Sequence, residues 1–264
     1  MSGRPKPLPR FYRWQTNLIQ IPLMTAITAI CGSLALLVSF ADRRGRAQHR
    51  IAQAWARGLL WCAGCQLTVK SQENLHEHPV AVYASNHTSY MDTPVIFASL
   101  PFQFRILAKK DLWPIAFIGW YLDRSGQIPI DTANPHATLS SMGLGIKALR
   151  AGMPLFVFPE GGRTGDGKLR PFLSGAAYLA IRAQVPLVPI ALSGVYDLLP
   201  MHTRHLYPGK LTLAVGQPIE TVGMTLRQIE DLTEQLRTAI ADLLETRPCS
   251  TEDAVEEAGA HAEV

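Results

Sequence analysis

The chain has 264 residues, of which 47% are hydrophobic and 17% are charged, and this composition excludes disordered and fibrous proteins. It is long enough for one sizeable core, so one main domain is expected. The formal net charge of +4 favours an anionic partner, but no basic run is interleaved with aromatic residues, so we expect membrane lipids or an anionic substrate and no nucleic acid.

The first predicted element is the apolar segment 18–41, which has no charged residue over 24 positions. It is long enough to enter or to cross a hydrocarbon core. Basic residues flank it on both sides, at Arg10 and Arg13 and again within residues 43–50. These two basic flanks favour a helix that dips into one leaflet over a single crossing. The length of the segment and its poor cleavage site argue against a signal peptide.

A second helix is predicted directly after it. Four residues at roughly helical spacing indicate this helix: Ile51, Trp55, Leu59 and Cys62. We therefore expect residues 1–65 to form an N-terminal region with two membrane-associated helices over residues 15–65. The pair Cys62 and Cys65 forms a C-x-x-C pattern without a second pair, so two small hydrophobic residues are a better interpretation than a redox pair or a metal site.

Strand-like and helix-like segments alternate over residues 66–247. The strand-like segments are 66–70, 80–85, 104–108, 126–130, 154–159, 186–191 and 210–215. The helix-like segments are 91–99, 111–122, 135–151, 174–184 and 224–245. Thr225 is the expected N-cap of the last helix. This alternation predicts an α/β domain with a mixed, largely parallel sheet flanked by helices, in which ligands meet the loops at strand ends.

The end of the chain has the opposite charge. From Cys249 onwards there are five acidic residues and no Lys or Arg. We expect residues 248–264 to be a disordered acidic tail.

His87 and Asp92 stand five positions apart in "ASNHTSYMDTP", directly after the strand-like segment 80–85. A carboxylate that holds a histidine fixes its tautomer and makes the imidazole a general base. The serines beside glycine, Ser174 and Ser193, lack the first glycine of G-x-S-x-G, so no serine nucleophile is indicated. The base is therefore expected to act on a substrate hydroxyl or on water.

A glycine-rich stretch, "FPEGGRTGDGKLR", follows the strand-like segment 154–159. Gly161 and Gly162 allow backbone amides to approach an anion, and Arg163 can hold a phosphate with two parallel hydrogen bonds. Glu160 would orient Arg163. Each motif alone is weak, because Gly-Gly is also an ordinary loop dipeptide. Their occurrence in order after two strands is a strong signal.

At these residues the sequence resembles the glycerophospholipid acyltransferase family, whose best-known members are the bacterial lysophosphatidic acid acyltransferases. "NHTSYMD" is similar to the family block N-H-x-x-x-x-D, and "FPEGGRT" is similar to F-P-E-G-T-R-S. The resemblance implies His87 as general base and Asp92 as its partner. It also implies substrate binding by Asn86, Glu160, Gly161 and Arg163. "VPLVPI" looks like the proline-bearing block on the acyl-chain side.

One family block departs from the pattern. Members that use lysophosphatidic acid commonly close a G-x-x-x-I-x-R strand with arginine, whereas "GQIPIDT" ends in Thr132. Lys110 or Arg124 would then supply the missing positive charge to the acceptor. This departure leaves the head group of the acceptor open.

The resemblance implies a membrane-associated O-acyltransferase of phospholipid biosynthesis. It would move a fatty acyl chain from acyl-carrier protein or acyl-CoA to the hydroxyl of a lysophospholipid, with 1-acyl-glycerol-3-phosphate as the leading acceptor. No bound cofactor and no metal are expected, and the expected location is the cell membrane with the catalytic domain facing the cytoplasm. The alternatives are an acyltransferase for another lyso-lipid head group, a lipid hydrolase, and a lipid-binding module without enzymatic activity.

Overall fold

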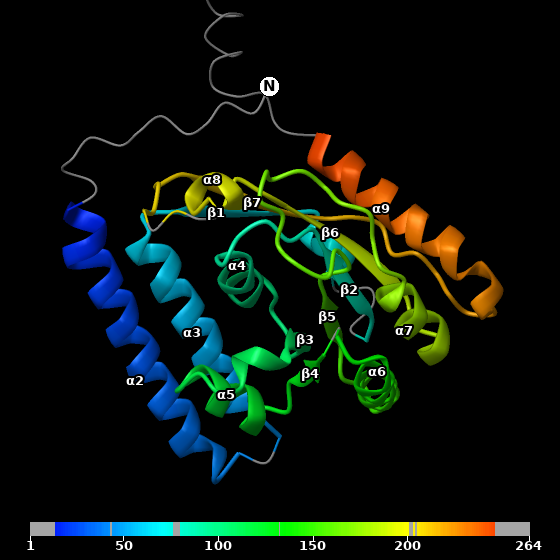
Figure 1. Cartoon of the computed structure of the whole chain (residues 1–264), viewed down its shortest axis with the longest axis horizontal. Coiled ribbons are helices and arrows are strands. Elements are labelled where there is room, and N and C mark those ends of the chain that lie inside the picture. The colour runs from blue at the N-terminus through cyan, green and yellow to red at the C-terminus, as the bar shows by residue number, and fades with distance from the viewer. Residues whose placement is uncertain are drawn as a thin grey trace, which may run out of the picture.

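The computed structural model describes residues 14–42, 44–75, 80–131, 133–200, 203 and 205–245. The acidic tail expected at 248–264 lies outside the described residues, as do Thr132 and the basic flank at Arg10 and Arg13. In the described part, helices cover both faces of one seven-stranded sheet (Figure 1).

All seven predicted strands are present, with ends that differ by a few residues. They are β1 (Gln66–Lys70), β2 (Val82–Ser85), β3 (Arg105–Lys109), β4 (Ile128–Ile130), β5 (Leu155–Val157), β6 (Leu187–Ser193) and β7 (Lys210–Val215). Their order in the sheet is β1-β7-β6-β2-β5-β3-β4. Neighbouring strands are parallel except β6 and β7, which are antiparallel. The predicted mixed, largely parallel sheet is confirmed.

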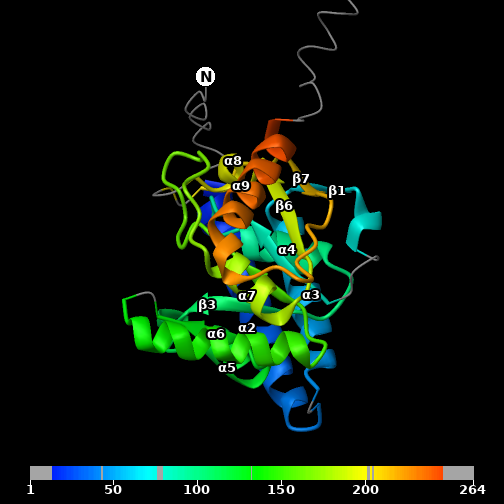
Figure 2. The ribbon, with the colours of Figure 1, turned by 90° about the vertical axis from the view of Figure 1, so that its right-hand side faces the viewer.

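Two helical layers enclose this sheet. The helices are α2 (Ile21–Ser39), α3 (Arg46–Cys62), α4 (Asp92–Ser99), α5 (Ile118–Arg124), α6 (Pro135–Arg150), α7 (Gly175–Ala183), α8 (Val195–Leu198) and α9 (Ile229–Glu245). Figures 1 and 2 show α6, α7 and α9 on the face opposite α2 to α5, and each layer has its own hydrophobic core against the sheet. As predicted, Thr225 is an N-cap: it forms a capping box with Gln228 at the 3-10 turn Leu226–Gln228, which leads directly into α9.

The N-terminal region contains the two helices that the sequence predicts. Helix α2 packs against α3 and α5, while α3 packs against α4 of the α/β domain. The indole Nε1 of Trp55 donates a hydrogen bond to Thr28 Oγ1 at 3.0 Å and joins the two helices. The helical stretch Thr16–Ser39 is long and apolar enough to cross a membrane, and only 6% of its most apolar window is buried. Its placement in a membrane stays a prediction.

One predicted helix, 111–122, has a different form. A 3-10 turn occupies Lys110–Leu112 and α5 begins only at Ile118. Pro114 has no N–H group to donate within a helix, and Phe117 has a φ of +63°, so the helical path is interrupted between them. The interruption brings Phe117 against α2 at Gly32, where an added Cβ would lie 2.6 Å from the Cβ of Phe117.

The sheet order places two loops side by side. Strands β2 and β5 are parallel neighbours, with Val82 opposite Leu155 and Ala84 opposite Val157. Their carboxyl ends therefore meet at the same edge of the sheet, which is where α/β proteins bind ligands. The loop 86–92, called the catalytic loop below, follows β2. The loop 158–173, called the glycine-rich loop below, follows β5.

Candidate active site

His87 and Asp92 form a hydrogen-bonded pair in the catalytic loop. His87 Nδ1 lies 2.7 Å from Asp92 Oδ2, and the Asp92 side chain is completely buried. The same oxygen accepts the backbone N–H groups of Thr88 at 2.6 Å and Ser89 at 2.9 Å, because the loop wraps around the carboxylate before α4 begins. A carboxylate accepts only, so Nδ1 carries the proton and Nε2 keeps its lone pair for a substrate proton.

The imidazole ring of His87 is also held from its face. It stacks on Phe158 with ring centroids 3.9 Å apart and planes 18° apart. The side chain is 13% exposed and lines the large cavity described below. Since Nδ1 faces Asp92, the opposite ring edge with Nε2 is the edge available to a ligand. This is the geometry of a general base.

Glu160 connects the two loops. Its Oε1 accepts the backbone N–H of His87 at 2.8 Å, and its Oε2 accepts the backbone N–H of Arg170 at 3.2 Å. Burial raises the pKa of Glu160 to about 7, although these two hydrogen bonds act to lower it. Both oxygens accept backbone N–H groups, so Glu160 braces the two loops. Its expected roles in holding the acceptor and orienting Arg163 stay predictions.

The glycine-rich loop supplies the basic side chain of the site. The Thr164 N–H donates to the His87 carbonyl at 3.0 Å and holds this loop against the catalytic loop. Gly161 has a φ of +70°, and an added Cβ would lie 2.8 Å from a methyl of Leu173, so glycine is required there. Gly161, Gly162 and Arg163 all line the cavity, as the predicted binding role needs.

The cavity has a volume of about 870 Å³. It extends from His87 between α2, α3 and α5 on one face of the sheet, and reaches α6 and α7 on the other face. It can reach both faces because β3 pairs with β5 at only two positions, Arg105–Leu155 and Ile106–Phe156, after which the strands separate. Its walls are mostly apolar, which suits a hydrocarbon chain.

The structure gives Asn86 a structural role, and the substrate-binding role implied by the resemblance stays a prediction. Its amide nitrogen donates to the Leu192 carbonyl at 3.0 Å, and its amide oxygen accepts the Leu192 N–H at 2.8 Å. The side chain is buried, at 3% exposure. Asn86 therefore ties the exit of β2 to β6 and fixes where the catalytic loop begins.

The structure places the two basic candidates outside the motifs away from the cavity wall, and their role in binding the acceptor stays a prediction. The ammonium group of Lys110 lies 4.0 Å from Asp131 and is highly exposed. Arg124 lies over the ring of Phe40 near the end of α2, 5.0 Å from its centroid. Neither lines the cavity, whereas Lys109 does, with its ammonium group 2.7 Å from Asp111.

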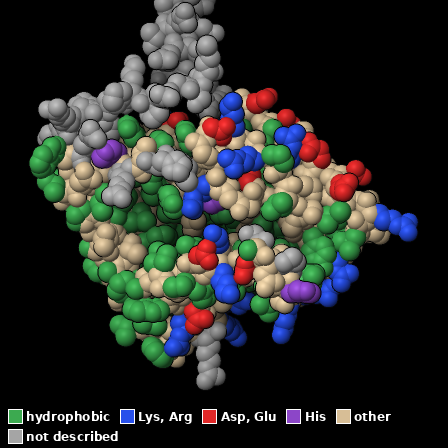
Figure 3. Space-filling view, viewed as in Figure 1, with side chains coloured by type: hydrophobic (Ala, Val, Ile, Leu, Met, Phe, Trp, Pro, Cys, Tyr) green, Lys and Arg blue, Asp and Glu red, His purple; other side chains and the backbone are tan. Residues whose placement is uncertain are grey.

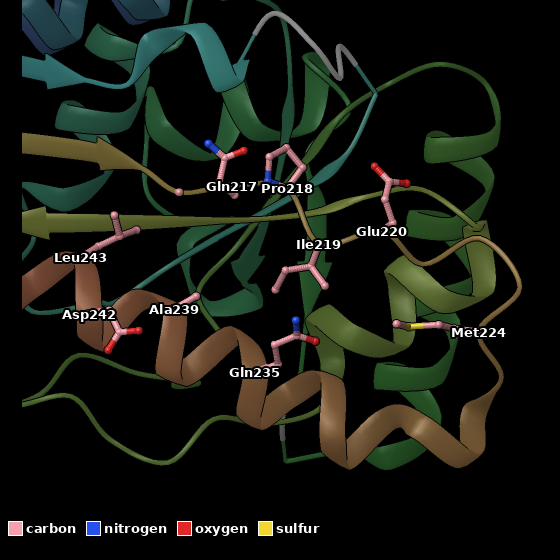
Figure 4. A pocket seen from close by; sticks show the side chains of 10 residues that line it. Gln217, Pro218, Ile219, Glu220, Met224, Gln235, Ala239, Asp242 and Leu243 are labelled. Atoms are coloured by element: carbon pink, nitrogen blue, oxygen red, sulfur yellow. The ribbon is translucent and has the colours of Figure 1, made fainter.

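A second hollow, of about 530 Å³, lies between α9 and the segment that follows β7 (Figure 4). Ile219 and Met224 contribute apolar surface there, and Glu220 and Asp242 contribute acidic groups. None of its lining residues belongs to the two loops. In the described part of the chain, no group of three or more His, Cys, Asp or Glu side chains is placed to hold a metal.

A match to a known protein family covers the region that contains both loops of the site. The family model described as Acyltransferase matches residues 66–193. A 1-acyl-sn-glycerol-3-phosphate acyltransferase of Limnanthes alba is 30% identical over 213 residues, which cover 80% of this chain and 75% of that protein. The human 1-acyl-sn-glycerol-3-phosphate acyltransferase beta is 27% identical, over 84% of this chain and 81% of its own.

A solved structure has the same fold. The 1-acyl-sn-glycerophosphate acyltransferase PlsC from Thermotoga maritima matches with a TM-score of 0.71 at 21% sequence identity. The match covers 89% of this chain and all of that one. The sheet, its flanking helices and the N-terminal helices therefore have a counterpart among known folds.

Proposed function

The chain belongs to the acyltransferase family, and we propose that it moves a fatty acyl chain from a thioester to the hydroxyl of a lysophospholipid, with 1-acyl-glycerol-3-phosphate as the leading acceptor. The donor in this proposal is acyl-CoA or acyl-carrier protein, and the product enters phospholipid synthesis. One observation carries the proposal: the His87–Asp92 pair opens onto a largely apolar cavity beside Arg163.

The proposed reaction is a direct transfer. His87 Nε2 takes the proton of the acceptor hydroxyl while the hydroxyl oxygen attacks the thioester carbonyl carbon. The tetrahedral intermediate then expels the thiolate, which takes the proton back from His87. The C–S bond breaks, an ester C–O bond forms, and Asp92 stabilises the transient imidazolium. A thioester is already activated, so alignment at the base supplies much of the catalysis and we expect no bound cofactor.

The acceptor and the acyl chain would occupy different parts of the site. Arg163, which lines the cavity, would hold the acceptor phosphate with two N–H groups. The apolar part of the cavity, bounded by side chains such as Phe97, Tyr121 and Met142, would hold hydrocarbon. This arrangement keeps a charged head group near the surface and an acyl chain inside.

We also propose that the N-terminal helices hold the protein on the cell membrane, with the catalytic domain on the cytoplasmic side. Figure 3 shows hydrophobic side chains gathered along the side of the molecule formed by α2 and at the end near α5. On α2, Ile30, Leu34 and Leu37 are 59%, 47% and 66% exposed. Ile115 and Trp120, each 45% exposed, extend this surface beside α5. Apolar patches of this kind mark contact sites.

Packing favours a helix embedded in one leaflet over a helix that spans the bilayer. Helix α2 lies along α3 and α5, and α3 carries the exposed arginines Arg46, Arg50 and Arg57. A spanning α2 would have to leave these partners or draw the arginines into hydrocarbon, which is costly. An α2 that lies in the outer part of one leaflet keeps its contacts.

Vesicle binding tests this placement. The double variant Leu34→Ser and Leu37→Ser should lower partitioning into anionic vesicles at least about tenfold, because each leucine loses burial in lipid. Val222→Ser is the matched control, since Val222 is 74% exposed but lies near the far end of α7. Equal partitioning of the wild type and the double variant would contradict the placement of α2 in lipid.

The activity test uses the purified full chain in detergent micelles with each donor and a panel of lyso-lipids. Mass spectrometry should find the diacyl product, with the phosphate monoester acceptor preferred over lyso-lipids with larger head groups. Release of free fatty acid faster than acyl transfer would show a hydrolase instead. Transfer to a different head group would keep the enzyme class and change the acceptor.

A further inference from the structure

Tyr90, in the middle of the catalytic loop, carries the guanidinium of Arg163 on the face of its ring. We propose that Tyr90 is a positioning residue that aims Arg163 at the phosphate of the acceptor and thereby sets acceptor preference. The inference rests on the proposed function, because it takes a phosphate as the group that Arg163 binds. It adds a residue that neither motif assigns to binding.

The contact itself is close. The guanidinium carbon of Arg163 lies 3.8 Å from the centroid of the Tyr90 ring, within the range of cation–π stacking. The ring is 59% exposed, so it is not a core side chain. An aromatic ring held at the surface against a cation has a role that core packing does not explain.

The backbone beneath Tyr90 is firmly held. The N–H groups of Thr88 and Ser89 donate to Asp92, and the Ser89 hydroxyl donates to the Leu199 carbonyl at 3.0 Å. The Met91 N–H donates to the same hydroxyl at 3.3 Å. Tyr90 is thus anchored on both sides and keeps a fixed place relative to His87.

Arg163 has little other support. A Cβ built at Gly162 or Gly165, on either side of it, would meet nothing within 4 Å, so no packed neighbour supports the loop at those two positions. Among the described residues, no carboxylate forms an ion pair with Arg163. A carboxylate partner would occupy its N–H groups. The Tyr90 ring covers a face and leaves the planar N–H edge free for two phosphate oxygens.

This arrangement fixes the distance between the general base, His87, and the guanidinium group of Arg163. His87 takes the proton of the acceptor hydroxyl, and Tyr90, three residues later, holds the group that binds the phosphate. One short loop therefore sets how far the hydroxyl and the phosphate of the acceptor stand apart. Loss of the ring should weaken acceptor binding and leave the chemistry at His87 intact.

The experiment is a double-mutant cycle on the full chain in micelles, with 1-acyl-glycerol-3-phosphate as the acceptor. Tyr90→Leu should raise the KM for the acceptor about threefold to tenfold, while kcat and the KM for the donor change less than about twofold. Tyr90→Phe keeps the ring face and should stay within about twofold of the wild type. In an Arg163→Ala background, Tyr90→Leu should cause no further rise.

Two results would overturn the inference: an equal effect of Tyr90→Leu with and without Arg163, or a loss of kcat that Tyr90→Phe does not restore. Thermal melting of each variant identifies misfolding, and a misfolded Tyr90→Leu would assign the ring a structural role. An inactive wild type on every phosphate acceptor would reject the proposed function itself. An active wild type whose Tyr90→Leu variant keeps its acceptor KM would reject the positioning role alone.

Discussion

The two loops of the site are built differently. In the catalytic loop, one buried carboxylate, Asp92, receives the imidazole and two backbone N–H groups, all within five residues. The glycine-rich loop is more exposed, and its contacts to the catalytic loop come from Phe158, Glu160, Thr164 and Arg163. The catalytic loop is held mainly by hydrogen bonds within it, whereas the glycine-rich loop is held by its contacts to the catalytic loop.

We expect this difference to separate the loop that carries out the reaction from the loop that binds the acceptor head group. A general base must be held within a few tenths of an ångström of its working position, and a short, buried, locally hydrogen-bonded loop provides that precision. A group that binds a head group tolerates more variation. Changes in the catalytic loop should therefore reduce kcat, and changes in the glycine-rich loop should mainly change how the acceptor is bound.

The largest effect is expected for Asp92→Asn. The new amide would present N–H groups to His87 Nδ1 or to the backbone N–H groups of Thr88 and Ser89, and would favour the tautomer with the proton on Nε2. We expect kcat to fall by about 10³-fold or more while the fold persists. Steady-state kinetics with saturating donor and acceptor measure the kcat of the variant against that of the wild type. A fall of less than about tenfold would mean that Asp92 serves the fold and not the base.

An intermediate effect is expected at Arg163. Arg163→Lys keeps the charge but loses the two parallel hydrogen bonds. We expect transition-state binding to weaken by about 1–3 kcal/mol, so that kcat/KM for the acceptor falls roughly 5-fold to 150-fold. Arg163→Ala should lose at least as much, and the KM for the donor should change little in both. A loss that appears in the donor KM would move Arg163 to the thioester side of the site.

The smallest effect is expected at Glu160, and it depends on pH. The pKa of Glu160 is raised from 4.5 to about 7 by burial, so the folded state holds a proton that the unfolded state has already released. The contribution of Glu160 to the free energy of unfolding is fully present below pH 4.5 and is lost as the pH rises to about 7.

Thermal melting of the wild type and Glu160→Gln between pH 4.5 and 8 measures this dependence. The glutamine side chain keeps an acceptor for the His87 N–H and does not titrate. The wild-type melting temperature should fall relative to the variant by several degrees across the window and then run parallel above it. A difference that stays constant with pH would mean that Glu160 is ionised throughout.

The sequence predicts best what its local contacts determine. His87 and Asp92 lie five residues apart, and both the strand before them and the helix that begins at Asp92 follow from hydrophobic pattern alone. The same holds for the seven strands and for the cap at Thr225. In each case the residues that decide the structure are neighbours in sequence.

Longer-range contacts escaped prediction. Asn86 pairs with Leu192 across 106 residues, and Glu160 pairs with the His87 backbone across 73, so neither role is visible in its own motif. Lys109 and Lys110 are adjacent in sequence, but only Lys109 lines the cavity, because β3 ends at Lys109 and the chain turns away into a 3-10 turn at Lys110. The late start of α5 depends on the left-handed backbone at Phe117, which a phenylalanine does not signal.

The central claim is that the buried His87–Asp92 pair transfers an acyl chain to a lysophospholipid hydroxyl. The most direct test measures diacyl product in vesicles containing 1-acyl-glycerol-3-phosphate, for the wild type and His87→Ala at matched amounts of membrane-bound protein. The account predicts product from the wild type and a loss of at least about 100-fold in His87→Ala, with unchanged melting and vesicle binding. Product formation by His87→Ala at more than about a tenth of the wild-type rate would contradict it.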